Sequence, residues 1–349
     1  IKMKLDLQNV KKIFDNNNLS FVFKKDNIKG WNNIITNFSY TPVAYTNKSI
    51  EYENYYSFDN SEEYLDISII ISLNNKSVGI WPLTISHKKD NFQLTSQGQS
   101  ILPPLFLEEI NKKERKKLVL KCYNSLNFFF NEYNIDKIKS NEIFLDKQIH
   151  SISEWHRLFL DNKAKITINY TMFACLSGGI DKYRKSLRKS YKPLINQGLK
   201  IWKVKKLFND NKSIWTDFKE LHYRVSSGKT RSEKTWQRQY DSIIIGEAFL
   251  IYLLNDTGEM IGGGYFTLSQ NEAVYSIGAY DRKLFDKPIG HVIQYEAIQE
   301  FIKRNIDWYK IGMLTNYEGE VSAKDKSIQV FKNGFASHII PEYVFNKHF

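Results

Sequence analysis

The chain has 349 residues, of which 42% are hydrophobic and 25% charged, so it is long enough for two cores and too apolar for global disorder. No apolar run approaches the roughly 20 residues that span a bilayer, which excludes a membrane-spanning helix. The formal net charge of +12 indicates either an anionic partner (phosphate, nucleotide, nucleic acid or acidic sugar) or a Lys- and Asn-rich composition without such a partner.

In chain order, the first half predicts a short helix with a connector, an aromatic turn-rich segment, a hairpin, a proline-containing loop, a long helix, a strand and a short helix. The corresponding positions are 5–23, 45–56, 65–85, 97–105, 112–133, around 138 and 155–160. The long helix is predicted from Leu118, Cys122, Leu126 and Phe129, which recur at helical spacing.

The second half predicts a strand, a basic helix, a strand, two helices, a hairpin, a strand, a helix, a strand, a helix and a closing strand. The corresponding positions are 166–176, 180–195, 199–207, 213–225, 233–245, 249–268, 273–280, 289–304, 309–312, 327–333 and 337–345. We expect residues 163–165 to link the two halves, which gives domains at 1–165 and 166–349.

The two halves repeat one pattern. Each has a hairpin, then an amphipathic basic helix, then a similar short tag, Asn134-Ile135-Asp136-Lys137-Ile138-Lys139 in the first half and Asn305-Ile306-Asp307-Trp308-Tyr309-Lys310 in the second. Internal duplication restricts the fold strongly. We expect an α/β (α+β) protein of two similar domains, each a mixed, mostly antiparallel sheet flanked by helices.

Cysteine and histidine usage indicates a reducing compartment and no metal site. The two cysteines are too few for a disulfide framework, and the seven histidines stand singly rather than at metal-ligand spacing. Residues 1–6 lack the apolar region of a signal peptide. We therefore expect a cytoplasmic protein without a metal.

The predicted helix 180–195 carries the densest positive charge. Its cations are Lys182, Arg184, Lys185, Arg188, Lys189 and Lys192. Like charges at i,i+4 spacing destabilise a helix, which a bound anion would relieve; a solvated basic face is the alternative. Pro193 should kink or restart the helix near Lys192, which would aim Ser190 and Tyr191 into a site.

Glycine and polar segments offer further candidates. Gly262-Gly263-Gly264 interrupt a strand, which indicates close approach of a ligand or a helix, or else a bulge. The turn 287–290 precedes a helix whose free N–H groups suit a pyrophosphate or carboxylate. His222 precedes the basic loop 226–231, and Lys332 lies among aromatic residues. The sequence shows no nucleophile elbow, Walker loop or metal quartet, which favours direct transfer between two bound substrates.

Four segments resemble the FemAB-like acyltransferases, which are built on tandem GNAT (N-acetyltransferase) domains. They are Leu187-Arg188-Lys189-Ser190-Tyr191-Lys192, Gly263-Gly264-Tyr265-Phe266, Pro288-Ile289-Gly290-His291 and Phe331-Lys332-Asn333-Gly334-Phe335. The duplication described above extends the resemblance over nearly the whole chain.

The resemblance implies transfer of an acyl or aminoacyl group to an amine of a cell-wall precursor or surface-glycan amino sugar, phosphorylated or nucleotide-linked. It implies acyl-CoA (acetyl-CoA foremost) or aminoacyl-tRNA as donor. Two departures matter. The chain lacks the long helical hairpin of some bridge-forming members, which weighs against tRNA, and its phosphate-loop glycine pattern is incomplete in both halves. We expect the first domain to shape the acceptor site and the second to be catalytic.

On this resemblance we assign roles to individual residues. His222 is the predicted general base, with Asp281 as second choice. Arg184, Lys185, Arg188, Lys189, Tyr191 and Lys192 are predicted to bind substrate phosphates, and Arg231 and Lys332 to position the acceptor. Backbone N–H groups near 276–280 are expected to hold the oxyanion, and Ser276, Gly278, Gly290 and His291 to contact the donor. The alternatives are a nucleic-acid-binding protein without catalysis and a structural partner protein that has lost activity.

Overall fold

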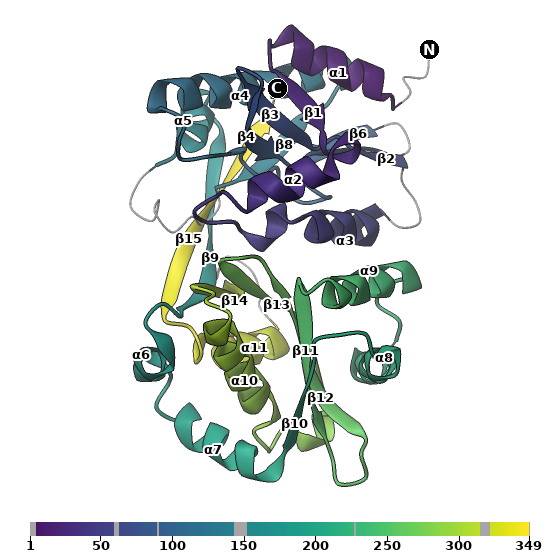
Figure 1. The fold of residues 1–349 in the computed structure, drawn as a ribbon, viewed down its shortest axis with the longest axis vertical. Helices are drawn as coiled ribbons and strands as arrows, with labels where there is room; N and C mark the ends of the chain where they lie inside the picture. Colours follow the sequence, from purple (N-terminus) through teal and green to yellow (C-terminus); the bar gives the residue numbers. More distant parts are fainter. Residues whose placement is uncertain are drawn as a thin grey trace. The chain divides into compact units, whose positions relative to one another are not determined.

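The computed structural model describes residues 5–58, 63–88, 91–142, 152–226, 228–314 and 322–348. Residues 1–4 and Ser227, on which parts of the sequence analysis rest, lie outside the described residues. The chain forms two compact units, Ile1–Ile168 with Glu342–Phe349, and Asn169–Pro341 (Figure 1). Strands β9 (Lys165–Cys175) and β15 (His338–His348) each run from one unit into the other.

The N-terminal unit combines short antiparallel sheets with helices. Its helices are α1 (Leu7–Asn16), α2 (Ile28–Ile35), α3 (Asn47–Phe58), α4 (Lys112–Tyr133) and α5 (Glu154–Asp161), with 3-10 turns at Lys24–Asp26 and Val43–Tyr45. Its strands are β1 (Phe21–Phe23), β2 (Glu63–Asp66), β3 (Ile69–Leu73), β4 (Lys76–Trp81), β5 (Thr84–Lys88), β6 (Asn91–Thr95), β7 (Leu105–Phe106) and β8 (Lys137–Asn141). They pair in the orders β1-β3-β4-β7 and β2-β5-β6, and β8 pairs with β15.

Local sequence explains most of these elements. Asn74 and Asn75 both adopt positive φ, the conformation that a two-residue hairpin turn requires. The predicted helix 112–133 is confirmed. Its start is capped by Asn111, whose Oδ1 accepts from the Glu114 backbone N–H. The predicted hairpin 65–85 is wrong from Pro82 on, where the chain leaves β4 and continues in another sheet as β5.

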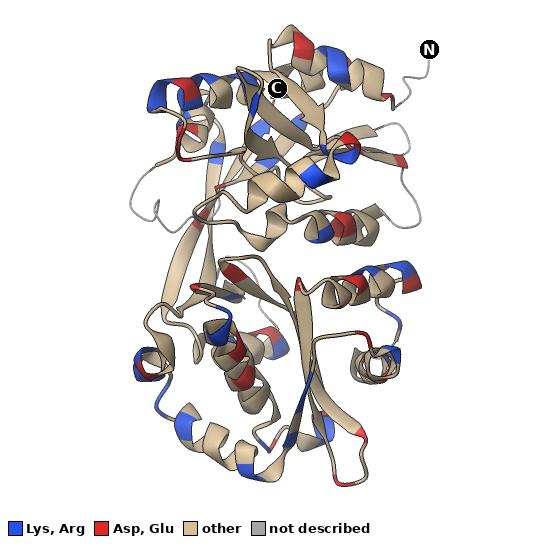
Figure 2. Ribbon diagram, in the orientation of Figure 1, with Lys and Arg blue, Asp and Glu red and all other residues tan. Residues whose placement is uncertain are grey.

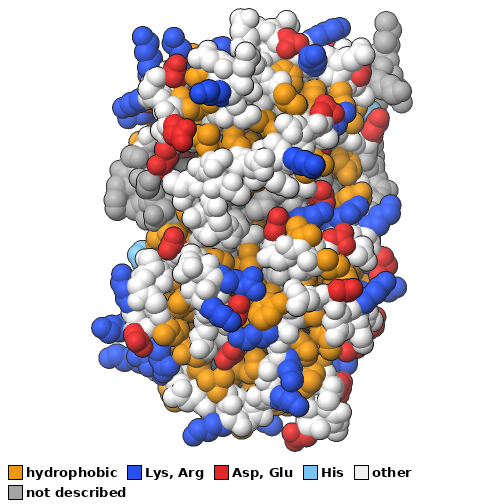
Figure 3. All heavy atoms as spheres, in the orientation of Figure 1, with side chains coloured by type: hydrophobic (Ala, Val, Ile, Leu, Met, Phe, Trp, Pro, Cys, Tyr) orange, Lys and Arg blue, Asp and Glu red, His pale blue; other side chains and the backbone are white. Residues whose placement is uncertain are grey.

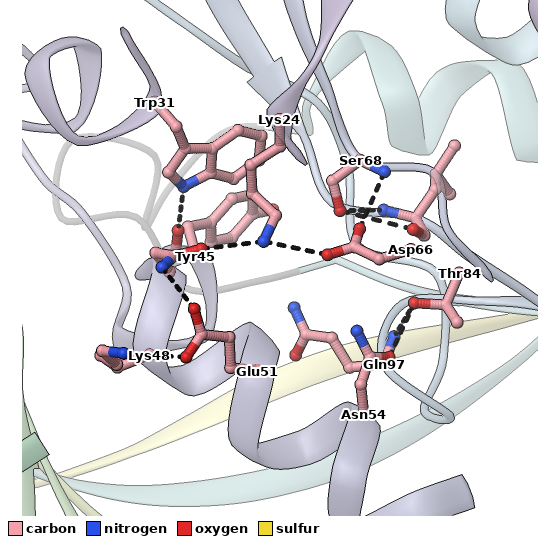
Figure 4. A network of polar contacts seen from close by, with 12 residues as sticks. Lys24, Trp31, Tyr45, Lys48, Glu51, Asn54, Asp66, Ser68, Thr84 and Gln97 are labelled. Atoms are coloured by element: carbon pink, nitrogen blue, oxygen red, sulfur yellow. Dashed lines mark hydrogen bonds and ion pairs between the residues drawn. The ribbon is translucent and has the colours of Figure 1, made fainter. Parts of the chain in front are cut away.

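The predicted turn-rich segment 45–56 is also wrong, because α3 is a regular helix. Its inner face includes the polar residues Asn47, Glu51 and Asn54. The segment therefore lacks the continuous apolar row at helical spacing that would have predicted a helix. These side chains join a polar network (Figure 4). The ammonium of Lys24, which is 4% exposed, lies 2.9 Å from Asp66 Oδ2 and donates to Asn47 Oδ1. The network fixes α3 and β2 to each other through buried polar contacts.

The C-terminal unit has one main sheet in the order β10-β11-β12-β13-β14-β9. Its strands are β10 (Lys203–Leu207), β11 (Ala248–Leu254), β12 (Met260–Leu268), β13 (Glu272–Tyr280) and β14 (Trp308–Leu314). Its helices are α6 (Gly179–Ser186), α7 (Tyr191–Ile201), α8 (Lys212–Ser226), α9 (Glu233–Ile244), α10 (Ile289–Lys303) and α11 (Ala323–Asn333), with a 3-10 turn at Arg282–Leu284. The predicted hairpin 249–268 and the predicted helix 289–304 are confirmed.

The three glycines of β12 let helices pack closely on both faces of this sheet. A Cβ on Gly262 or Gly264 would lie 2.6 or 2.7 Å from side-chain atoms of α10, and one on Gly263 would lie 2.7 Å from Phe218 of α8. Such separations are too short for carbon atoms. Of the alternatives that the sequence left open, close approach of helices is the one observed.

The predicted basic helix 180–195, with a kink or restart near Lys192, is interrupted earlier than predicted. Helix α6 ends at Ser186, Leu187 is extended, and α7 begins at Tyr191. The break places the Arg188 N–H on the carbonyl of Gly334. Pro193 then lies in the first turn of α7, where a missing N–H is harmless. Because α7 continues to Ile201, the predicted strand 199–207 starts only at Lys203.

Candidate functional site

The central strands of the C-terminal sheet diverge. β13 and β14 run parallel and pair only through Glu272–Val274 and Trp308–Lys310. Beyond that point, β13 continues along β12, and β14 continues along β9. A register shift at Ser276 bends β13 at the place where the pairing ends. We call this region the opening.

Lys332 of α11 reaches into the opening. Its Nζ lies 5.3 Å from the ring centre of Tyr275 on β13. A Cβ built on Gly312 of β14 would lie 2.7 Å from the same nitrogen, and Gly312 has φ +151°. Glycine is therefore favoured at 312 by its backbone conformation, and its missing side chain leaves room for the lysine.

The Lys332 ammonium has no hydrogen bond or ion pair with any described residue. Burial lowers its pKa below the ordinary value, since the charged form loses hydration. An unpaired cation inside a fold is unfavourable unless something pairs with it. The opening thus offers three unused N–H donors on a positive charge.

A polar cluster lies beside this lysine, beneath α10. The hydroxyls of Tyr275 and Tyr280 are 2.6 Å apart, and Tyr309 donates to Oε1 of Gln294. Gln294 is fully buried and its Nε2 has no hydrogen-bond partner. Burial raises the pKa of Tyr280 to about 12, so its hydroxyl stays protonated and can donate. The cluster and Lys332 together can stabilise an oxygen atom that gains negative charge.

The sequence pointed to Lys332 but not to its neighbours. Gln294 and the three tyrosines resemble ordinary core positions of a helix and two strands. The signal available was Gly312, since an isolated glycine in a predicted strand indicates close approach of another group. The partner of that approach comes from α11 and could not be inferred from local pattern.

The predicted phosphate-binding cations lie on α6, the start of α7 and the link between them. Lys185, Arg188 and Lys189 are exposed, and Lys192 is half-buried. Arg184 is not free, because it donates to the hydroxyl of Tyr295 at 2.8 Å. Figure 2 shows blue ribbon segments at α6 and the start of α7, and Figure 3 shows blue side chains gathered in the same place. This surface can attract an anion, but it is not enclosed.

Tyr191, His291 and Gly290 pack together at the start of α10. The Tyr191 and His291 ring centres are 4.5 Å apart, and a Cβ on Gly290 would lie 2.8 Å from the Phe331 ring. Burial lowers the pKa of His291 to about 4, so the ring is neutral at pH 7. On this side, aromatic side chains of the chain itself cover the first turn of α10.

His222 and Arg231 lie among α8 and α9, on the sheet face opposite to α10. His222 is 8% exposed, its ring packs 5.3 Å from that of Trp236, and its Nδ1 has no hydrogen-bond partner in the part of the chain that the structure describes. Burial, with a smaller contribution from Arg231, lowers the pKa of His222 to about 4. The ring is therefore neutral at pH 7, although a weak base. The guanidinium of Arg231 stacks 5.0 Å from the Trp236 ring.

The remaining predicted residues lie on or just after β13. Ser276 and Gly278 are exposed, and Ser276 Oγ is 2.8 Å from Thr267 Oγ1. A Cβ on Gly278 would overlap the Tyr275 hydroxyl. Asp281 accepts from the Lys283 N–H and caps the following 3-10 turn. The structure thus brings Lys332 and β13 together, and leaves His222 and Arg231 on the other face.

No protein-family model and no curated protein matches the sequence, but solved structures do. FemX matches with a TM-score of 0.68 and 12% identity, over 90% of this chain and 95% of that chain. The chain has the fold of FemX. The FemAB-like fold of tandem GNAT units, predicted from the sequence, is therefore confirmed.

Two further structures share this fold. L-PGS from Bacillus licheniformis matches with a TM-score of 0.53 and 11% identity, over 78% of this chain and 81% of that chain. The C-terminal domain of a putative lysylphosphatidylglycerol synthetase from Agrobacterium fabrum matches at 0.55 and 9%, over 93% and 92%. At these identities the likeness concerns the fold.

Two features are absent from the described residues. No helix among them combines the length and apolar character needed to cross a bilayer. The same residues hold no group of three or more His, Cys, Asp or Glu side chains that could bind a metal ion.

Proposed function

We propose that the chain transfers an acyl or aminoacyl group to an amine, with the opening between β13 and β14 as the reaction site. The observation that carries the proposal is the Lys332 ammonium, which lies between Tyr275 and Gly312 and has no ion-pair partner among the described residues. The FemX fold supports it, since the chain shares that fold over most of its length.

In this proposal the amine attacks the carbonyl carbon of a thioester or ester, and the carbonyl oxygen becomes negative. Lys332 donates to that oxygen, and the Tyr275–Tyr280 hydroxyl pair supplies a second donor. The bond from carbon to sulfur or oxygen then breaks, and the amine nitrogen loses its proton to a base. Because His222 lies on the sheet face opposite to α10, Asp281, which follows Tyr280 directly in the chain, is the proposed base.

The donor is proposed from the surroundings of α10. Aromatic side chains cover part of its first turn, where the pyrophosphate of acyl-CoA would bind through Gly290 and His291. The exposed cations of α6 and α7 suit a long polyanion. Both observations favour aminoacyl-tRNA over acyl-CoA. The proposed acceptor is a phosphorylated or nucleotide-linked amino sugar of a cell-envelope precursor.

The test supplies the purified chain with a UDP-linked amino sugar and with either radiolabelled acetyl-CoA or radiolabelled aminoacyl-tRNA. Label recovered in the sugar measures transfer. Lys332→Met keeps the length of the side chain and removes the charge, and Lys326→Met, on the exposed side of the same helix, is the matched control. We expect Lys332→Met to lower transfer roughly 10²–10³-fold and Lys326→Met to leave it unchanged.

Full transfer by Lys332→Met would refute the assigned site. Retention of tRNA on a filter, without transfer from either donor, would instead favour the alternative of a nucleic-acid-binding protein without catalysis.

A further inference from the structure

The N-terminal unit has an opening of its own. Ile101 and Ser140 form an isolated parallel bridge, as the first residues of β13 and β14 do in the other unit. After it, the chain turns away through Pro103 and Pro104 into β7, which pairs with β4, while β8 pairs with β15. Two strands that meet in parallel and then part leave a space between them and the helix that connects them.

That space is a cavity of about 570 Å³, within the range of small-molecule sites. Helix α4 contributes Lys112, Arg115 and Val119 to its walls, and α5 contributes Trp155 and Arg157. The apolar part of the lining also includes Leu105, Phe106 and Ile110. The equivalent space in the C-terminal unit contains Lys332 and the tyrosines, so the two openings differ in what occupies them.

The cations and acids that line this cavity differ in their partners. Lys112, Arg115 and Arg157 form no ion pair with a described residue, and Arg115 donates only to the backbone carbonyl of Leu107. Arg115 Nε is buried and has no hydrogen-bond partner among the described residues.

The acids, in contrast, are engaged. Glu142 accepts from Ser153 Oγ at 2.8 Å and lies 3.7 Å from His156 Nδ1. Glu154 lies 3.9 Å from Lys116 Nζ, and Glu108 accepts from Ser39. Three cations and three carboxyl groups line the cavity, so its formal charge is balanced, and among the described residues the cations are the members that lack a side-chain partner.

We propose that this cavity binds a small amphipathic anion, a carboxylate or phosphate attached to an apolar group. The apolar group lies against Val119 and Trp155, and the anionic group lies toward the unpaired cations of α4 and α5. This site belongs to the N-terminal unit alone and does not depend on the proposed transfer reaction.

Calorimetric titration with four probes of equal chain length tests the proposal. The probes are octyl phosphate, octanoate, octylammonium and 1-octanol, each kept below the concentration at which it aggregates. We expect one or both anions to bind at least roughly tenfold tighter than octanol or octylammonium, because two or three charge contacts are added. The anion that binds with the higher affinity shows whether the site prefers a phosphate or a carboxylate group.

Two double variants locate the binding. Lys112→Met with Arg157→Met removes two exposed lining cations, and Lys113→Met with Lys117→Met removes two exposed cations of α4 that do not line the cavity. We expect the first to weaken the binding of the preferred anion roughly tenfold and the second to leave it within about twofold. Equal losses in both doubles, or octanol and octylammonium binding as well as the anions, would overturn the proposal.

Discussion

Replacing Gly312 by alanine tests whether the backbone at this position holds Lys332 in place. Gly312 has φ +151°, a conformation that costs an L-residue about 1–3 kcal/mol. The added Cβ would lie 2.7 Å from Lys332 Nζ, but the end of a lysine can move, so steric overlap adds little. For a unit of this size, about 1–3 kcal/mol corresponds to a fall in Tm of roughly 2–12 °C.

Turnover should fall further than stability alone explains. Moving the ammonium by about 1 Å is expected to lower transfer roughly a hundredfold. Gly246 is the matched control, because it also has positive φ but no atom within 4 Å of an added Cβ; Gly246→Ala should lower Tm and leave transfer unchanged. In a Lys332→Met background, Gly312→Ala should have no further effect on transfer.

Calorimetric unfolding and the transfer assay together decide the outcome. A Gly312→Ala protein with unchanged Tm would show that the strain was overstated. A destabilised protein with full transfer would refute the role of Gly312 in positioning the ammonium.

Two further predictions concern the N-terminal unit. Asp66→Asn leaves the buried Lys24 ammonium without its counter-ion and should lower the free energy of unfolding by about 2–3 kcal/mol. This is less than the full value for a buried pair, because the Asp66 side chain is 24% exposed. Urea unfolding measures the loss, and a loss under about 0.5 kcal/mol would contradict the prediction. Burial raises the pKa of Glu142 from 4.5 to about 7, so the folded state binds more protons than the unfolded state between these values and this contribution to stability falls as pH rises through that window. His156, whose pKa burial lowers, partly opposes the trend. The free energy of unfolding of Glu142→Gln, relative to that of the wild type, should therefore rise by up to about 3 kcal/mol between pH 4.5 and pH 8. A difference in urea unfolding that does not change with pH would contradict this prediction.

Elements whose signal is local could be predicted from the sequence. The hairpin turn at Asn74 and Asn75 and the helices Lys112–Tyr133 and Ile289–Lys303 depend on residues within a few positions of each other. Between 180 and 195, the high density of basic residues was read as one helical surface. In the structure, the helix is interrupted where the Arg188 N–H donates to the carbonyl of Gly334. Helix α3 was missed because polar residues, rather than apolar ones, occupy part of its buried face.

The candidate site could be predicted only in part. Lys332 was found through its aromatic surroundings, but its position depends on Gly312, 20 positions away in the sequence, and on Tyr275 in another strand. His222 and Arg231 were grouped with it because they looked chemically useful. Their helices pack on the other face of the sheet, where Phe218 of α8 closely approaches Gly263, and local sequence does not show which face a helix covers.

The duplicated fold explains why the two openings have different chemistry. A parallel pair that separates leaves a space between its strands, so each unit has the same structural problem. In the C-terminal unit, Lys332, Gln294 and three tyrosines occupy the space, and the fold tolerates an unpaired cation there. In the N-terminal unit, Pro103 and Pro104 remove two backbone donors, and the space remains a cavity. Selection for one opening to react and for the other to bind would produce this division, which the two substitution sets above test separately.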